Sequence, residues 1–172
     1  MREPLADALG LAPGADVADI GAGTGMFLGP LSRRVGNDGR VFAVDISPRF
    51  LEHLGERAAR EGLFNVTVVH AREDSVGLGS ASIDLAWVCD TYHHFEYPKS
   101  TLASLFDAIR PGGALVVVDF HREPGKTPEW LLEHVRAGRD VFRAEIEAAG
   151  FLYESEPEVG LRANYMLRFR RP

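Results

Sequence analysis

Residues 15–25 read Ala-Asp-Val-Ala-Asp-Ile-Gly-Ala-Gly-Thr-Gly. The first half is a short apolar run that Asp19 interrupts near its end, which is typical of a buried parallel strand. Three glycines follow at alternate positions: Gly21, Gly23 and Gly25. Glycine allows positive φ and close approach of a ligand. A helix is expected to begin around residues 24–26, with its free backbone N–H groups facing the turn. The stretch therefore predicts a strand, a ligand-binding turn and a helix.

Composition limits the class of protein. The chain has 172 residues and 45% apolar residues, which predicts one globular domain spanning residues 1–172 with a sizeable core. A formal charge of −6 argues against nucleic acid and against an anionic membrane surface as partners. The sequence shows no apolar run of roughly 20 residues and no signal peptide, and a single cysteine excludes an internal disulfide. We therefore expect a cytoplasmic protein without a membrane or nucleic-acid partner.

Strand and helix patterns alternate along the chain. Strands are expected at residues 15–20, 40–45, 66–70, 83–89, 114–120, 151–155 and 165–170. Helices are expected at residues 3–10, from the glycine turn to 35, and at 48–61, 98–109 and 128–149, the last capped by Thr127. This order predicts a doubly wound, Rossmann-like α/β fold, with helices on both faces of a seven-stranded sheet. The sheet is mostly parallel, and its last strand is antiparallel. Ligands of such sheets bind beyond the carboxyl ends of the strands.

The spacing of the glycines separates two classes of cofactor-binding turn. The dinucleotide fingerprint is Gly-x-Gly-x-x-Gly, whereas Met26 here occupies the position of its third glycine. The observed pattern, from Asp19 to Gly25, resembles motif I of the class I S-adenosylmethionine-dependent methyltransferases. The resemblance implies that the methionine moiety of the cofactor lies over the three glycines and that Asp19 lies near its ammonium group.

Carboxylates after the next two strands are further candidates for the cofactor site. Asp45 ends the second strand, where a carboxylate can accept hydrogen bonds from both ribose hydroxyls; the alternative is a local interaction with the helix that follows. In the family that this motif resembles, the next apolar residue, here Ile46, packs against adenine. The family also places a polar residue after the third strand to accept from the adenine amino group. Glu73 and Asp74 are the candidates, with Asp74 preferred by its spacing to the fourth strand.

The fourth strand and its continuation resemble motif IV of the same family. Residues 84–95 read Asp-Leu-Ala-Trp-Val-Cys-Asp-Thr-Tyr-His-His-Phe. In that family this strand end lies beside the sulfonium and the acceptor, so Cys89 is assigned to the cofactor site, although its thiol is typical of a buried apolar group. Residues 110–113, Arg-Pro-Gly-Gly, match the family's turn before the fifth strand. The stretch is similar to the small UbiE-like methyltransferase domain, particularly in Tyr-His-His-Phe before the helix.

Methyl transfer from a sulfonium depends mainly on positioning, and a base is needed only when the acceptor carries a proton at neutral pH. Imidazole has a suitable pKa, so the catalytic candidates are His94, His93 and Asp90; the structural alternative is that a histidine caps the next helix. No metal is assigned. The alternative is a cation site at which Asp90, after the fourth strand, and His94 meet Asp119 and His121 at the end of the fifth strand. His134 is expected on the solvent face of a helix.

These observations predict an enzyme, an S-adenosylmethionine-dependent methyltransferase that acts on the O, N or C atom of a small-molecule acceptor. A homodimer is left open. Two alternatives remain: a non-catalytic subunit or sensor that binds the cofactor, and an NAD-dependent oxidoreductase, which Met26 disfavours.

Overall fold

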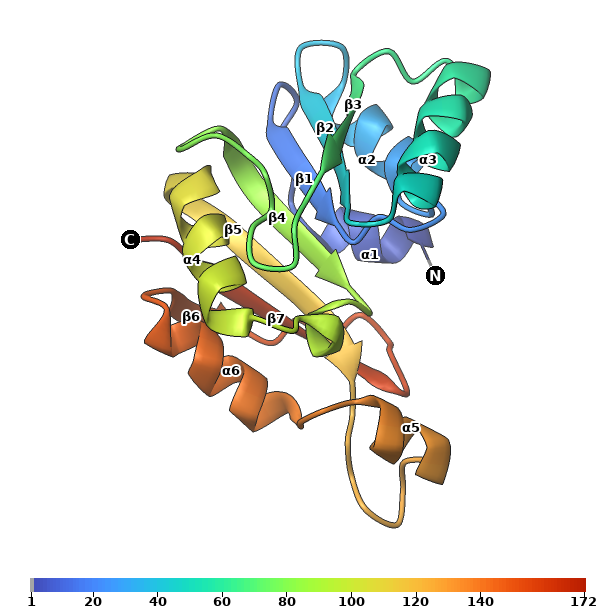
Figure 1. Cartoon of the computed structure of the whole chain (residues 1–172). Coiled ribbons are helices and arrows are strands. Elements are labelled where there is room, and N and C mark those ends of the chain that lie inside the picture. Colours follow the sequence, from blue (N-terminus) through green and yellow to red (C-terminus); the bar gives the residue numbers. More distant parts are fainter. Residues whose placement is uncertain (1) are drawn as a thin grey trace.

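A seven-stranded sheet forms the centre of the computed structural model, which describes residues 2–172. The strands lie in the order β3-β2-β1-β4-β5-β7-β6. The pairs from β3 to β5 are parallel, whereas β7 is antiparallel to β5 and to β6. Helices α1, α2 and α3 lie on one side of the sheet, and α4 and α6 on the other (Figure 1). The predicted Rossmann-like fold, with its antiparallel last strand, is confirmed.

The bounds of the elements follow the alternation expected from the sequence. The strands are β1 Asp16–Ile20, β2 Arg40–Asp45, β3 Val66–His70, β4 Ile83–Cys89, β5 Ile109–Phe120, β6 Leu152–Ser155 and β7 Asn164–Arg170. The helices are α1 Arg2–Ala8, α2 Leu28–Val35, α3 Pro48–Glu61, α4 Pro98–Ala108, α5 Glu129–His134 and α6 Arg139–Ala148, with a 3-10 turn, η1, at Tyr92–His94. None of the helices within residues 2–172 is long and apolar enough to cross a membrane.

The helix expected over residues 128–149 is wrong, because the chain forms α5 and α6 with a break between them. Val135 adopts an extended conformation. The guanidinium of Arg122 donates hydrogen bonds to the carbonyls of Val135, at 2.9 Å, and Leu132, at 3.0 Å. These carbonyls would otherwise accept from the next helical turn, so Arg122 satisfies the end of α5. The hydroxyl of Thr127 donates to the carbonyl of His121, and α5 has no side-chain cap.

The helix after the glycine turn also begins later than expected. It starts at Leu28, after a series of turns from Gly21, and not around residues 24–26. Gly21, Gly23 and Gly25 all have positive φ, a conformation that cannot continue a right-handed helix. The turn is therefore longer than the sequence pattern suggests.

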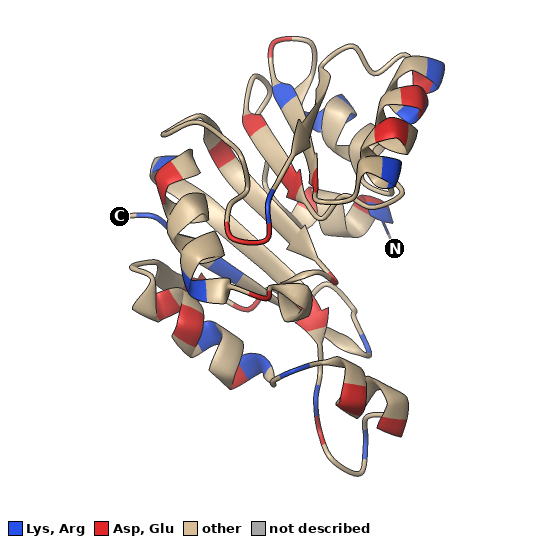
Figure 2. Cartoon of the chain, viewed as in Figure 1, with Lys and Arg blue, Asp and Glu red and all other residues tan. Residues whose placement is uncertain are grey.

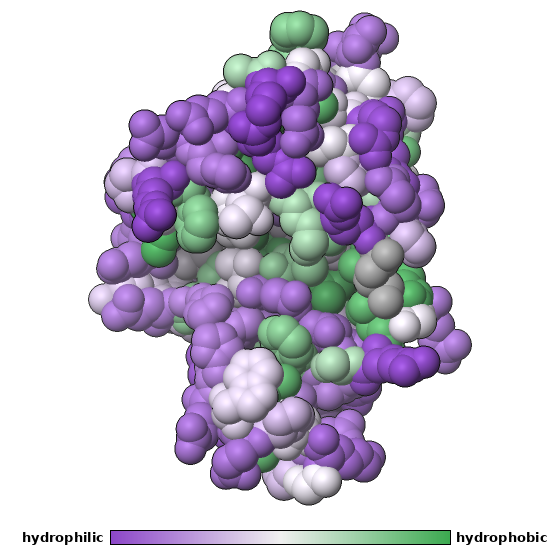
Figure 3. Space-filling model, turned by 90° about the vertical axis from the view of Figure 1, so that its right-hand side faces the viewer, coloured by the Kyte–Doolittle hydropathy of each residue, from purple (hydrophilic) through white to green (hydrophobic). Residues whose placement is uncertain are grey.

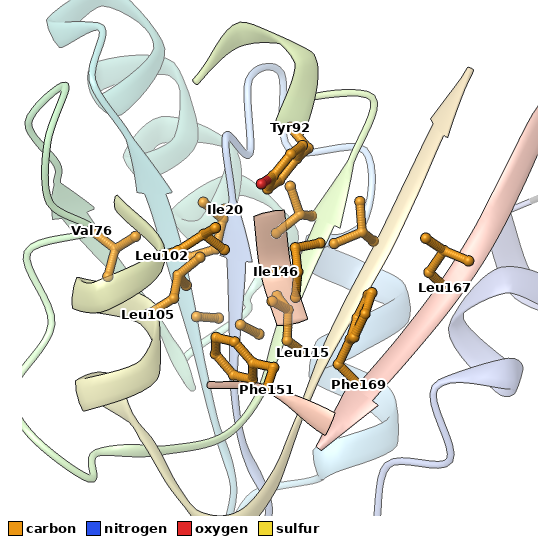
Figure 4. Close-up of a cluster of buried hydrophobic side chains, with 14 of the residues drawn as sticks. Ile20, Val76, Tyr92, Leu102, Leu105, Leu115, Ile146, Phe151, Leu167 and Phe169 are labelled. Carbon is orange, nitrogen blue, oxygen red and sulfur yellow. The ribbon is translucent and has the colours of Figure 1, made fainter. Parts of the chain in front are cut away.

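Apolar side chains fill both faces of the sheet. On one face, α4, α5 and α6 pack against the strands through Leu102, Leu131, Phe142 and Ile146; Leu102 and Ile146 are seen within this cluster in Figure 4. On the other, α1, α2 and α3 cover the sheet with the side chains of Leu5, Leu9, Phe27, Leu31 and Leu54. Full burial of such a side chain contributes roughly 1.5–3 kcal/mol. The sheet is thus anchored on both sides, and the ends of its strands are held at fixed positions.

The amino ends of the central strands are joined by an ion cluster. Asp16 accepts hydrogen bonds from the guanidinium groups of Arg40 and Arg110, at 2.7–2.9 Å. Arg110 also pairs with Asp84 at 2.8 Å, whose second oxygen accepts the backbone N–H of Asp16. The bonds from Arg40, followed by those from Arg110, hold the pKa of Asp16 at about 2. The cluster therefore connects β1, β2, β4 and β5.

Candidate functional site

Carboxylates gather at the opposite, carboxyl end of the sheet, where the arrowheads of β1, β2 and β5 and the end of β4 are marked as acidic in Figure 2. Three lie in strands, Asp19 in β1, Asp45 in β2 and Asp119 in β5, and Asp90 directly follows β4. Within residues 2–172, no lysine or arginine forms an ion pair with any of these four. This end of the sheet is therefore suited to a cationic ligand.

The glycine turn lies between the ends of β1 and β2. The backbone N–H groups of Gly21 and Ala22 both donate to the carbonyl of Val44, which fixes the start of the turn. An added Cβ at Gly21 would lie 2.3 Å from a side-chain carbon of Thr91, whereas one at Gly23 would meet only a carbonyl oxygen at 3.9 Å. Gly21 therefore permits close packing with the loop after β4, and Gly23 leaves open space.

Asp19 lies near the carboxyl end of β1. The side chain is buried, and within the described residues 2–172 its Oδ2 has no hydrogen-bond partner. Burial, with a smaller effect of the neighbouring Asp45 carboxylate, raises the pKa of Asp19 to about 7. A buried carboxylate without a partner is costly, and a bound ammonium group would relieve this cost. This unpartnered oxygen fits the cationic end of S-adenosylmethionine.

Asp45 bridges the turn and the next helix. Its Oδ2 accepts the backbone N–H of Gly23 and its Oδ1 that of Ser47, each at 2.9 Å. A carboxylate has about four lone-pair sites, so two remain for ribose hydroxyls. The local interaction that was the alternative interpretation is thus present, and it leaves room for the ligand.

A cavity of about 330 Å³ is lined by Gly21, Gly23 and Asp45, whereas Asp19 and Gly25 are not part of its lining. This volume lies at the lower end of the range for small-ligand sites. Its lining comes from the glycine turn, the start of α3, the loop after β3 and the loop after β4: Ile20, Gly21, Gly23, Val44, Asp45, Ile46, Phe50, Ala71, Arg72, Glu73, Ser75, Val76, Thr91, His94, Phe95, Glu96 and Thr101. In Figure 3 the surface is hollowed across its middle, with apolar side chains between hydrophilic rims.

The predicted cofactor residues divide into those that line this cavity and those that do not. Ile46 lines it and is 55% exposed. Glu73 lines it too, whereas Asp74 borders a neighbouring cavity and pairs with Arg72 at 3.3 Å. The geometry thus favours Glu73 over the preferred Asp74. Cys89 is not part of the lining; it packs against the core cluster beneath α1 and α2, and burial raises the pKa of its thiol.

Phe50 and Thr91 also line the cavity and were not predicted from the sequence. Phe50 lies in the first turn of α3, and it is an exposed apolar side chain beside Ile46 in the cavity lining. Its position five residues after Asp45 is the signal that could have identified it. Thr91 reaches the cavity because its side chain packs against Gly21, a contact between segments 70 residues apart that no local pattern reveals.

The candidate catalytic residues occupy different environments. His94 lines the cavity and is exposed; desolvation, His93 and His134 lower its pKa. His93 is buried, with Nδ1 2.8 Å from Asp119 Oδ1 and Nε2 3.2 Å from His134 Nε2. Only His94 of the two histidines therefore borders the ligand space.

Asp90 lies outside the cavity lining. It has a positive φ and accepts a hydrogen bond from Asn164 at 2.7 Å. Desolvation, followed by the neighbouring Asp119 carboxylate, raises the pKa of Asp90 to about 6. The alternative cation site does not form as expected, because His121 packs against Tyr165 and Asp119 binds His93.

The doubly wound sheet, the glycine turn and the partly free carboxylates define a site for a nucleoside cofactor with a cationic end. Residues 17–113 match the methyltransferase domain family, and the chain belongs to this family. Its cofactor is S-adenosylmethionine, and the fold and motifs are those of class I. A solved structure of an S-adenosylmethionine-dependent methyltransferase from Aquifex aeolicus has a TM-score of 0.90 at 27% identity, covering 99% of this chain and 89% of that one.

Two curated relatives match a smaller part of the chain. The ubiquinone/menaquinone biosynthesis C-methyltransferase UbiE of Erwinia tasmaniensis is 29% identical over 117 residues, which are 67% of this chain and 47% of that protein. A protein of transposon TN4556 from Streptomyces fradiae is 34% identical over 116 residues, 67% of this chain and 33% of that protein. The chain thus spans between a third and a half of the length of these relatives.

Proposed function

We propose that the protein transfers the methyl group of S-adenosylmethionine to an O, N or C atom of a small-molecule acceptor. The observation that carries the proposal is the buried Oδ2 of Asp19, which has no hydrogen-bond partner within residues 2–172 and lies two residues before a glycine turn that lines the cavity. The similarity to UbiE, a C-methyltransferase by name, supports the same class of reaction and does not identify the acceptor.

The residues of the site have separate roles in this proposal. Asp19 meets the ammonium group, the remaining lone pairs of Asp45 accept from the ribose hydroxyls, and Ile46 with Phe50 provides apolar surface for the adenine. Glu73 is placed to accept from the adenine amino group. When bound, the sulfonium supplies an activated methyl group, so the protein contributes mainly the position of the acceptor.

His94 is the residue that meets the acceptor. It borders the cavity on the side of the loop after β4, together with Phe95. As a free imidazole it accepts a proton from an acceptor hydroxyl or amine. His93 is held by Asp119 and His134 and acts through the position of its neighbour, and Asp90 is the second candidate for a base.

The alternative functions differ in the cofactor that the protein would bind and in whether it would catalyse a reaction. A non-catalytic subunit would bind the cofactor and transfer nothing, and an oxidoreductase would bind NAD. A homodimer and a cytoplasmic location stay predictions; sedimentation velocity would measure the first.

Calorimetric titration tests the cofactor site. S-adenosylmethionine and S-adenosylhomocysteine should bind, NAD should not, and Asp45→Ala should weaken binding of both sulfur cofactors. An acceptor screen with radiolabelled methyl groups then tests transfer. For an acceptor that carries a proton, His94→Gln should lower kcat by about 10²–10⁴-fold. Absence of cofactor binding by the intact chain would refute the proposal.

A further inference from the structure

Three histidines meet beside the cavity, from two segments of the chain. His93 and His94 belong to η1, and His134 is the last residue of α5. Each offers a ring nitrogen, and the three nitrogen atoms lie within 4.8 Å of one another. His93 is buried, whereas the other two are exposed. The cluster therefore has a fixed member and two members that can move.

The two closest nitrogens have the separation of metal ligands. His93 Nε2 and His134 Nε2 are 3.2 Å apart. Two nitrogens bound to one zinc ion at about 2.0–2.1 Å with tetrahedral angles lie about 3.3 Å apart. The nitrogen of His94 lies within 4.8 Å of the other two, and because this side chain is exposed it has room to rotate toward them. The backbone thus already brings two of three ligands to the right distance.

Asp119 supports the cluster from below. The buried carboxylate accepts from the backbone N–H groups of His93 and Phe120, as well as facing His93 Nδ1 at 2.8 Å. A carboxylate is only an acceptor, so Nδ1 carries the proton and the lone pair of His93 lies on Nε2, facing His134. Ligating histidines typically donate their second ring N–H to a carboxylate in this way. A metal ion held by these nitrogens would also lie near the buried carboxylate of Asp119, which has no lysine or arginine partner within residues 2–172.

We propose that His93 Nε2, His134 Nε2 and His94 bind a divalent transition-metal ion, of which Zn²⁺ is the best match. Imidazole ligands favour zinc, copper, iron and nickel over magnesium and calcium, which prefer oxygen. Three protein ligands leave a fourth position open, as in catalytic zinc sites. Because His94 also lines the cavity, that position lies at the edge of the ligand space.

The role of this ion rests on the proposed function. His94 is the proton acceptor proposed above for the metal-free protein, and with the ion bound its ligating nitrogen would no longer be free to accept a proton. The bound ion would supply an open position for an oxygen of the acceptor, such as a phenol or enol hydroxyl, and would lower the pKa of that hydroxyl so that its proton passes to solvent at neutral pH. The substrate class is then an oxygen-bearing acceptor.

Titration of the metal-stripped full chain with Co²⁺ and Zn²⁺ tests the site. Each chain should bind one Co²⁺ ion and show the intense visible absorption of a tetrahedral site. Zn²⁺ should displace the Co²⁺. His134→Ala should weaken binding more than about 100-fold, and Asp119→Asn by about 10–100-fold, the usual effect of an outer-shell change. His53→Ala, on α3, is the matched control and should bind as the wild type does.

The readout does not depend on methyl transfer. Failure to bind S-adenosylmethionine with intact Co²⁺ binding would overturn the proposed function and leave the metal site standing. Equal Co²⁺ binding by the wild type and His134→Ala, or no stoichiometric binding by the wild type, would overturn the metal site. Because His134 is exposed, its variant should fold, which circular dichroism checks.

Discussion

Replacement of Asp19 by asparagine should stabilise the free protein while it weakens cofactor binding. Burial and the neighbouring Asp45 raise the pKa of Asp19 to about 7, from an ordinary value of 3.8. The folded state therefore holds this proton more tightly than the unfolded chain does. The difference, at 1.36 kcal/mol per pKa unit, corresponds to about 4 kcal/mol.

The sign of the pH dependence follows from this raised pKa. Between about pH 4 and pH 7 the unfolded chain releases the proton of Asp19 while the folded protein retains it, so the free energy of unfolding falls as the pH rises. Above pH 7 both states are ionised and the loss is complete. Asparagine does not titrate. The stability of Asp19→Asn relative to the wild type should therefore grow across this range by up to about 4 kcal/mol.

Urea unfolding across this pH range, without cofactor, measures the effect. The new amide also changes the stability of the variant by an amount that is the same at every pH. This change does not affect the test, because the measured quantity is the increase of the stability difference with pH. Asp38→Asn, at an exposed turn, controls for the loss of one negative charge and should show no such growth. A stability difference for Asp19→Asn that stays flat with pH, or unchanged cofactor affinity at pH 8, would refute the reasoning.

Three further predictions use other contacts. A cation bound beside Asp19 favours the ionised carboxylate, so cofactor binding at one pH unit below the pKa of Asp19 should release about 0.9 proton per protein. Calorimetry in buffers of different ionisation enthalpy measures this release. If no proton is released, the cofactor does not contact Asp19 through its cationic group. Gly21→Ala would place a Cβ 2.3 Å from a neighbouring side-chain carbon, so it should lower Tm and cofactor affinity far more than Gly14→Ala, where φ is also positive but the space is open; equal losses would contradict the steric argument. Tyr92→Phe removes a hydroxyl that donates to Glu145 at 2.9 Å and should lower the free energy of unfolding by about 1 kcal/mol; unchanged urea unfolding would show that this bond contributes nothing.

Local patterns predict the sheet because each strand and helix carries its own periodicity. They fail where the deciding contact is distant. The apolar residues Leu131, Val135, Phe142 and Ile146 have helical spacing and are all buried, so the predicted burial is correct. The break between Val135 and Phe142 depends on Arg122, which satisfies carbonyls at the end of α5 from outside the helix.

The candidate site, like the fold, can be predicted from the sequence only where its residues lie within a local pattern. The glycine turn, Asp19 and Asp45 are recognisable because they are contiguous with strand patterns. The choice between Glu73 and Asp74 depends on the loop conformation, which residue spacing alone does not determine. His134 meets His93 across 41 residues, and a histidine at the end of an exposed helix carries no local signal of such a partner.

The ion cluster of Asp16, Arg40, Asp84 and Arg110 has a consequence for how this protein can evolve. It fastens the amino ends of four strands with charges that balance one another, while the ligand-facing loops leave from the other end. Changes in the loops after β3, β4 and β5 therefore do not remove the ionic contacts of this cluster. Exchange of these loops between relatives should alter the acceptor and keep the scaffold, which makes the chain a suitable recipient for loop grafting.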